Sequence, residues 1–291
     1  MKDSRLSRAT PFLLPLGLLL GGCVTTSDYG RTQFVAPQGI GVAYSEIEMQ
    51  AQLALKSDAA CQGKECEAVA AFRREVRQLG TRLAKAARNL SVEAKTPAPY
   101  FYVQVPAKGE QGTLSSAGGS IVVFDGLRAV GFEEPALAFL VAREMGHVLA
   151  RHHEENSATN IAFSIAATLL LPVANIVRGA AATLPATTAM TATTTAASVA
   201  GSSILKGVYR PEQLREADTL ALRIMIRAGW TPMEVADALQ AAAPRLKDEG
   251  WMSELLVSKN RLDQITMGPP WLLPTNIADA GSGRSVTRDF E

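Results

Sequence analysis

Two ionisable side chains in the stretch "REMGH", Glu144 and His147, have the types and the spacing of a metallopeptidase site. A helix with the pattern H-E-x-x-H binds zinc through two imidazoles one turn apart, and its glutamate acts as a general base. Here Arg143 occupies the position of the first histidine. Because residues four apart share one side of a helix, Arg143 and His147 should project side by side. The stretch keeps the geometry of a two-ligand face but has only one of the two ligands.

The other histidines offer no evident replacement for the missing ligand. His152 and His153 lie within six residues of His147, and the chain contains no other histidine. On a continuous helix, residues five and six positions on are rotated away by more than about 100°. We therefore expect both to be solvated residues near the end of the helix. No imidazole from a distant element can complete a metal site.

Residues 1–22 have the pattern of a secretory signal peptide, with a basic start, an apolar run from Pro11 to Leu20 and two glycines before Cys23. The apolar run is too short to span a bilayer. The end of this segment resembles a bacterial lipobox, which predicts that Cys23 is lipidated and anchors a periplasm-facing protein to the cell envelope. Val24 favours the outer membrane over the inner one. The alternative is an ordinary signal peptide in which Cys23 has no role.

Two further cysteines, Cys61 and Cys66, lie close together and would face an oxidising compartment, so we predict a disulfide. Residues five apart in one helix are separated by a rise of about 7.5 Å and point to different sides. The bond therefore requires a turn at Gly63, between the end of one helix and the start of the next. Two free thiols on a loop are the alternative.

The chain of 291 residues is 47% hydrophobic, which predicts a globular protein. Its 29 Lys+Arg balance 28 Asp+Glu, so nothing suggests a nucleic-acid partner. After a linker over 23–43, helical patterns cover 44–60 and 66–90. The second pattern places one apolar stripe at steps of three and four, namely Val69, Phe72, Val76, Leu79 and Leu83.

The pattern changes to strands at 99–106 and 118–127, which are β-branched and aromatic runs bounded by Pro and Gly. A helix resumes at Glu133. Residues 156–205 form an apolar insert, whose most apolar part, Ile161 to Val177, is at the short limit for a membrane span. We favour a hydrophobic excursion over a true span. Further helices begin near Glu212 and, with a Thr N-cap, at Thr231. The Pro/Gly-rich segment 266–291 reads as a flexible tail.

These segments together resemble the gluzincin metallopeptidases of the CaaX prenyl protease and heat-shock membrane protease type, peptidase family M48, and within it the periplasmic lipoprotein branch. The resemblance rests on the lipobox, the helix pair, "GGSIVVFDGL", "REMGHVLARHH", the insert and "YRPEQLREADTLALRIMIRAGWTP", and it covers 44–265. It implies an α+β, mostly helical, zincin-like metallopeptidase domain with a small β-sheet packed on the REMGH helix.

The resemblance also assigns the site residues. Glu144 takes the place of the general base and His147 that of the second zinc ligand, whereas Arg143 takes that of the first. The third ligand in this family is a glutamate four residues before an aspartate; counted back from Asp218, that position is Leu214. With two ligands of three absent, we expect no bound cofactor. A guanidinium about 4 Å from zinc would also oppose binding by roughly 8 kcal/mol at an effective dielectric near 20.

We hypothesise that Arg143 replaces the charge of the metal and pairs with Glu144 or Asp218; the alternative is that it points to solvent in an eroded cleft. Two glutamates near Leu214, Glu212 and Glu216, lie on the opposite flank of their helix and would reach the site only if that helix were rotated or shifted.

The function that these residues favour is an envelope lipoprotein that is proteolytically impaired and binds a polypeptide client or a partner protein. In this family the strand "GSIVV" and its cleft receive an extended polypeptide by strand addition, which needs no metal. The first alternative is an active zinc metalloendopeptidase in envelope protein quality control, with Glu144 polarising the water. The second is a structural envelope protein whose apolar insert docks to a membrane or to another subunit.

Overall fold

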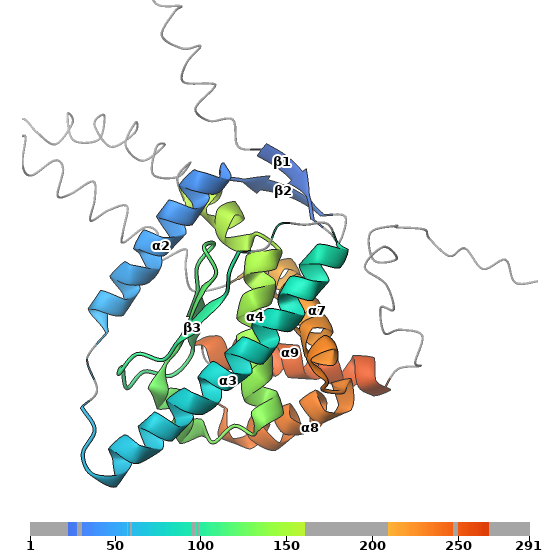
Figure 1. Cartoon of the computed structure of the whole chain (residues 1–291). Coiled ribbons are helices and arrows are strands. Elements are labelled where there is room, and N and C mark those ends of the chain that lie inside the picture. Colours follow the sequence, from blue (N-terminus) through green and yellow to red (C-terminus); the bar gives the residue numbers. More distant parts are fainter. Residues whose placement is uncertain are drawn as a thin grey trace, which may run out of the picture.

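A single helix, α4 (Glu134–Leu149), runs through the centre of the fold and carries the REMGH stretch (Figure 1). The computed structural model describes residues 23–27, 31–56, 58, 60–94, 97, 99–160, 209–246 and 250–267. Nearly every side chain of α4 is buried, including Arg143, Glu144 and His147. This helix packs most closely against α7 (Pro211–Ala228), because a Cβ on Gly146 would lie 2.5 Å from the carbonyl oxygen of Ala217. The glycine therefore lets the two backbones meet.

A long helix, α3 (Lys64–Glu93), packs on α4 and α7. The predicted apolar stripe is confirmed, since its five residues are all buried, and four of them, Phe72, Val76, Leu79 and Leu83, belong to the main core. Cys66, in the first turn of α3, forms a disulfide with Cys61, and Gly63 makes the turn between them with a φ of 55°. The bond thus connects the start of α3 to the segment that precedes it.

A three-stranded sheet packs against one side of α4. Its order is β3 (Tyr102–Gln104), β5 (Ser120–Val123), β4 (Thr113–Ser115), with β3 parallel and β4 antiparallel to the central β5. The sequence did not predict β4, which has only three residues, and the predicted strand 118–127 ends early in a 3-10 helix, η2 (Asp125–Val130). The α+β, mostly helical fold with a small sheet on the REMGH helix is confirmed.

The C-terminal part adds α8 (Pro232–Ala242), η4 (Ala243–Arg245) and α9 (Gly250–Met267). Helix α8 lies at the lower end of α4 in Figure 1, and α9 packs beside α7 and α8. The capping box predicted for α8 is present, since Thr231 and Glu234 exchange hydrogen bonds. Helix α9 runs two residues past the predicted domain end at 265. The rest of the predicted tail lies outside the described residues.

The segment 23–43, predicted as a linker, is structured instead. A hairpin of β1 (Cys23–Thr26) and β2 (Thr32–Val35) is followed by α2 (Gln38–Leu55), which begins six residues before the predicted helix. Alternate residues of β2 are buried, Gln33 and Val35 among them, so the hairpin is part of the fold. The prediction failed because two strands of four residues carry too little alternation to be recognised among the scattered Gly and Pro of this stretch.

The apolar insert is described only at its start. Residues 152–160 are helical, and the segment from Ile161 to Val177, with the rest of the insert, lies outside the described residues. Among the helices that the structure describes, none is long and apolar enough to cross a membrane.

Candidate functional site

Arg143 lies inside the protein, with only 3% of its surface exposed, so it does not point to solvent. Its closest carboxylate is that of Glu254 on α9, with 3.9 Å between Nη2 and Oε2. Neither Glu144 nor Asp218 pairs with it, so the hypothesis about its partners was wrong. The Nε and Nη1 atoms of Arg143 have no hydrogen-bond partner among the described residues. A cation does stand at the first ligand position, but it is poorly compensated.

Asp218 has partners of its own, which is why it is not available to Arg143. It accepts a hydrogen bond from Ser258 at 2.9 Å and forms an ion pair with Arg261, both on α9. Burial raises the pKa of Asp218 although the charges of Arg143 and Arg261 act to lower it. One turn earlier on α7, Leu214 is buried with 6% of its surface exposed, and an aliphatic side chain there supplies no metal ligand.

Glu144 is held by two hydroxyl groups from the edge strand β4. The Oγ1 atom of Thr113 donates to Oε1 at 2.6 Å, and the Oγ atom of Ser115 donates to Oε2 at 2.5 Å. Ser115 also lies 2.9 Å from Nε2 of His153. The carboxylate is therefore oriented by protein hydroxyls, in the place where a hydrolytic water would have to be activated.

His147 is fully buried and belongs to a chain of hydrogen bonds. Its Nδ1 lies 2.9 Å from Nδ1 of His152, whose Nε2 lies 2.9 Å from a carboxylate oxygen of Glu216. An ionised carboxylate only accepts, so His152 must donate from Nε2 and accept at Nδ1. His147 then donates from Nδ1, which leaves its Nε2 as a bare acceptor. That atom has no partner among the described residues.

The expectation that both later histidines are solvated was wrong for His152, which is fully buried. His153 is half-buried, and it lines a cleft beside Ser115. The physical reason is a break after α4: Arg151 adopts a φ of 59°, so the next helix returns His152 to the His147 side. Burial lowers the pKa of His147 and of His152, although Glu216 acts to raise the pKa of His152, and burial lowers the pKa of His153 to about 3.

Glu216 also lies in the cluster, although the sequence placed it on the far flank of its helix; Glu212 remains outside, beside Arg210. Burial acts to raise the pKa of Glu216, but hydrogen bonds from His152, Arg31 and Ser27 lower it to about 2. Arg31, from the loop of the β1–β2 hairpin, bridges Glu216 and Glu155 through four hydrogen bonds of 2.7 to 3.2 Å. The N-terminal hairpin is thereby tied to the cluster.

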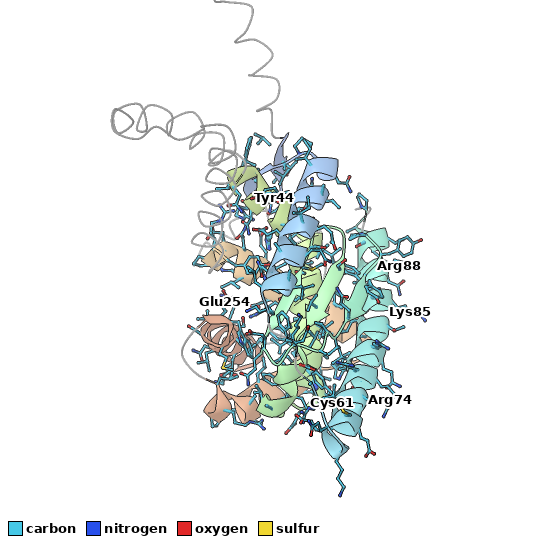
Figure 2. All side chains as sticks on the ribbon, turned by 90° about the vertical axis from the view of Figure 1, so that its left-hand side faces the viewer. Tyr44, Cys61, Arg74, Lys85, Arg88 and Glu254 are labelled. Carbon is cyan, nitrogen blue, oxygen red and sulfur yellow. A yellow bond between two sulfur atoms is a disulfide. The ribbon has the colours of Figure 1, made fainter. Side chains whose placement is uncertain are left out.

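A cleft of about 290 Å³ opens on Glu144. Its walls come from α2, β4, the 152–160 helix and the start of α7, with Tyr209 at one side. The ring of Tyr209 stacks on His147 with 3.6 Å between centroids. Figure 2 views the molecule from the α2 side, with Tyr44 on the blue helix in front and Glu254 on α9 labelled.

The strand that borders the cleft is β4, not "GSIVV". The latter contains β5, which already pairs with β3 and β4 and so cannot accept another strand. In β4, the Gly112 carbonyl and the Ser116 N–H bond to the β5 side, so the backbone groups of Thr113 and Ser115 face the free edge. These two residues line the cleft.

Sequence reasoning missed several residues of this site: Arg31, Thr113, Ser115, Tyr209 and Glu254. Thr113 and Ser115 stand in "GEQGTLSSAGG", a stretch for which the sequence predicted no element. Arg31 lies in the segment predicted as a linker, Tyr209 follows the insert, and Glu254 lies in a segment for which no element was predicted. No spacing in the sequence connects them to α4.

Central helices that present a glutamate and a histidine beside a small edge strand define a metallopeptidase-type fold. The sequence model of peptidase family M48 matches residues 74–268, which is more than half of the chain. The chain therefore belongs to peptidase family M48. No curated protein matches it.

Zinc is the metal typical of this family, and the donor set here does not fit it. A catalytic zinc needs about three protein ligands, whereas these positions hold a buried guanidinium, an aliphatic side chain and one imidazole. Within the described parts of the chain, no group of three or more His, Cys, Asp or Glu is arranged to hold a metal ion. We therefore assign no chemical step to zinc.

Proposed function

We propose that this family member is a lipid-anchored, periplasm-facing envelope protein that binds extended polypeptide without hydrolysing it. The observation that carries the proposal is the buried guanidinium of Arg143 at the first ligand position. A fixed positive charge supplies no ligand and repels a dication, and Leu214 supplies none either. Glu144 keeps its place but is engaged by Thr113 and Ser115.

The binding surface in this proposal is the free edge of β4 in the cleft. An extended segment can add there as a further strand, because the N–H and C=O groups of Thr113 and Ser115 face that edge. Main-chain hydrogen bonds provide affinity with little regard to sequence. The client is therefore an unfolded or extended stretch of an envelope protein, or of a partner protein.

Zinc content and proteolysis test the catalytic half of the proposal. We expect the protein, purified without chelators or added metal, to contain far less than one zinc per chain. Casein cleavage by wild type should equal that by Glu144→Gln. Stoichiometric zinc together with cleavage that Glu144→Gln abolishes would establish the alternative, an active metalloendopeptidase in envelope protein quality control.

A restored ligand set provides the positive control. Arg143→His with Leu214→Glu supplies the two missing ligands on the same pair of helices, so we expect the double variant to bind zinc. If it folds and binds none, the ligand positions have been assigned wrongly.

Strand addition is tested with fluorescent casein as the probe. Thr113→Pro removes an N–H that faces the cleft, whereas Thr113→Val keeps that N–H and removes only the hydroxyl. We expect the proline variant to lose at least about tenfold in affinity, which corresponds to 1.4 kcal/mol, and the valine variant to lose much less. Equal losses would show that the β4 backbone does not bind the polypeptide.

Anchoring is tested by the intact mass of the protein from a bacterial envelope. Acylation at Cys23 adds the mass of the lipid and removes residues 1–22. An unacylated mature chain, or a retained N-terminus, would contradict the lipoprotein assignment.

A further inference from the structure

We propose that the outward face of α2 lies on the lipid bilayer, so that the protein rests on the membrane by a helix as well as by its anchor. The inference goes beyond the polypeptide-binding function, and it rests on the proposed lipid anchor only for its choice of occupant. It starts from the apolar side chains that α2 exposes on its outer side.

The inner side of α2 is held to the domain by an apolar contact, Met49 against Val122 and Phe124, and by polar contacts. The Oγ atom of Ser45 accepts from the N–H of Ala117 at 2.6 Å, and Glu46 accepts from Ser116 at 2.7 Å. Only three of the 18 residues of this helix are buried: Gly41, Ser45 and Met49. A helix of this length normally gains its stability by packing an apolar face, and this one buries a narrow stripe.

The outer side of α2 is apolar instead. Ile40 is 55% exposed, Ile47 is 70% exposed and Leu55 is 80% exposed. Between them, the exposed positions form one continuous stripe, because they recur at steps of three and four: Ile40, Ala43, Ile47, Gln50, Ala51, Ala54 and Leu55. None of these side chains is charged. A helix on a water-exposed surface normally presents charged and polar side chains on its outer side. The outer side of α2 is therefore better suited to an apolar environment than to water.

The neighbouring hairpin continues the apolar character of this end of the molecule. Val24 and Phe34 are opposite each other on β1 and β2, and they are 71% and 45% exposed. Figure 1 shows the hairpin directly beside the N-terminal end of α2. Cys23, the proposed site of lipidation, is the first residue of β1.

The position of the proposed anchor at Cys23 makes the bilayer the surface that the outer side of α2 contacts. An acyl chain on Cys23 holds the hairpin at the lipid surface, and α2 starts immediately after β2. An amphipathic helix that lies in the interface buries its apolar face at the boundary of head groups and acyl chains. Helix α2 contains no Lys or Arg, so this contact depends on apolar burial and not on anionic lipid.

The consequence for the binding site is a defined position relative to the membrane. The inner side of α2, with Ser45 and Met49, forms one wall of the cleft that contains Glu144. A helix that contacts lipid with one side and the cleft with the other places polypeptide binding next to the bilayer. The clients that this geometry fits are segments that emerge from or approach the membrane surface.

The test uses the full, lipidated protein reconstituted in phosphatidylcholine vesicles that contain lipids brominated on the acyl chain. A single cysteine replaces Ile47 or, as a matched control, Val92 on α3, which is 71% exposed. Each carries an environment-sensitive fluorophore; Cys61 and Cys66 are in a disulfide and do not react. We expect the bromine to quench the label at position 47 and not the label at position 92. Equal quenching at both positions overturns the proposal.

A second measurement places the fluorophore on α2 with Ile40→Cys. One charge is then added either on α2 or, as a control, on α3. Ile47→Glu should reduce the ratio of lipid-immersed to exposed label at least about tenfold, and Val92→Glu should not change it. Immersion should not depend on salt or on added anionic lipid. If brominated lipid has no effect but the fluorescence changes with protein concentration, a second copy covers the face and the proposal fails. The intact mass reports acylation separately, so failure of the anchor is distinguishable.

Discussion

Arg31 is the residue whose removal should cost the most stability outside the main core. Its guanidinium joins Glu155 and Glu216, two carboxylates whose side chains are each only 5% exposed. Removing one partner of a buried ion pair typically costs about 3–5 kcal/mol. Here part of that cost is avoided, because Glu155 keeps its ion pair with Arg210 and Glu216 keeps its contact with His152. The Arg31 side chain is 20% exposed, and water screens part of its interactions. We therefore expect Arg31→Met to reduce the free energy of unfolding by about 2–4 kcal/mol.

A second arginine provides the control, because it makes the same kind of paired contact on the surface. Arg227 binds both oxygens of Glu93, and their side chains are 36% and 51% exposed. Exposed pairs contribute about 0–1 kcal/mol, so Arg227→Met should have little effect. The measurement is urea unfolding at neutral pH, followed by circular dichroism. If the two variants lose the same stability, the bridge does not support the fold.

The pH dependence of the Arg31 effect follows from Glu216. Its pKa of about 2 lies below the ordinary 4.5, so the stabilisation of this carboxylate is present above pH 4.5 and is lost as the pH falls toward 2. Without Arg31 the pKa of Glu216 should rise toward its ordinary value. The free energy of unfolding should then decrease less when the protein is acidified. The difference between wild type and Arg31→Met should therefore narrow below about pH 4.5. A difference that stays constant with pH would mean that Arg31 acts through packing alone.

Three further predictions follow from burial and close approach. Gly146→Ala should destabilise the protein by about 1–3 kcal/mol, since the added Cβ would lie 2.5 Å from a backbone oxygen of α7. Gly39→Ala in α2 places its Cβ in open space and should stabilise the protein by about 0.5–1 kcal/mol. Calorimetric melting temperatures should therefore change in opposite directions for the two variants. The three clustered histidines have lowered pKa values, so the unfolded chain binds more protons and stability should fall as the pH falls below about 6.5, by up to about 1.4 kcal/mol per pH unit for each. Burial raises the pKa of Glu254 to about 7 and also raises the pKa of Asp218, so these two carboxyl groups oppose the trend. A urea midpoint that stays constant between pH 7.5 and 5.5 would contradict this prediction. Reduction of the disulfide should cost about 2 kcal/mol, because it closes a short loop with a separation of 5 residues; an unchanged midpoint in reductant would refute that estimate.

The elements that the sequence predicted correctly are helices whose periodic pattern of apolar residues continues over several turns. The stripe from Val69 to Leu83 fixes α3, and the apolar face around Leu140 fixes α4, because periodicity over several turns outweighs local propensity. Helix α8 was predictable from its caps. The two short strands of the hairpin and β4 were not, since three or four residues carry too little pattern.

The site was predictable only where its residues share one helix. Arg143, Glu144 and His147 could be placed relative to one another by helix geometry, and all three are buried as a group. The contact between His147 and His152 depends on the left-handed backbone conformation of Arg151. The spacing of the two histidines in the sequence does not reveal that conformation. The contacts made by elements distant in sequence, α9 and the hairpin, depend on tertiary packing and were missed for that reason.

The close contact between Gly146 and Ala217 also has an evolutionary consequence. It fixes α4 against α7 through their backbones, so the geometry of the ligand positions does not require a metal to hold the helices together. Under the proposed loss of zinc, only two side chains at the ligand positions differ, and the backbone contact between α4 and α7 stays in place. Metal binding and architecture can therefore change independently in this fold.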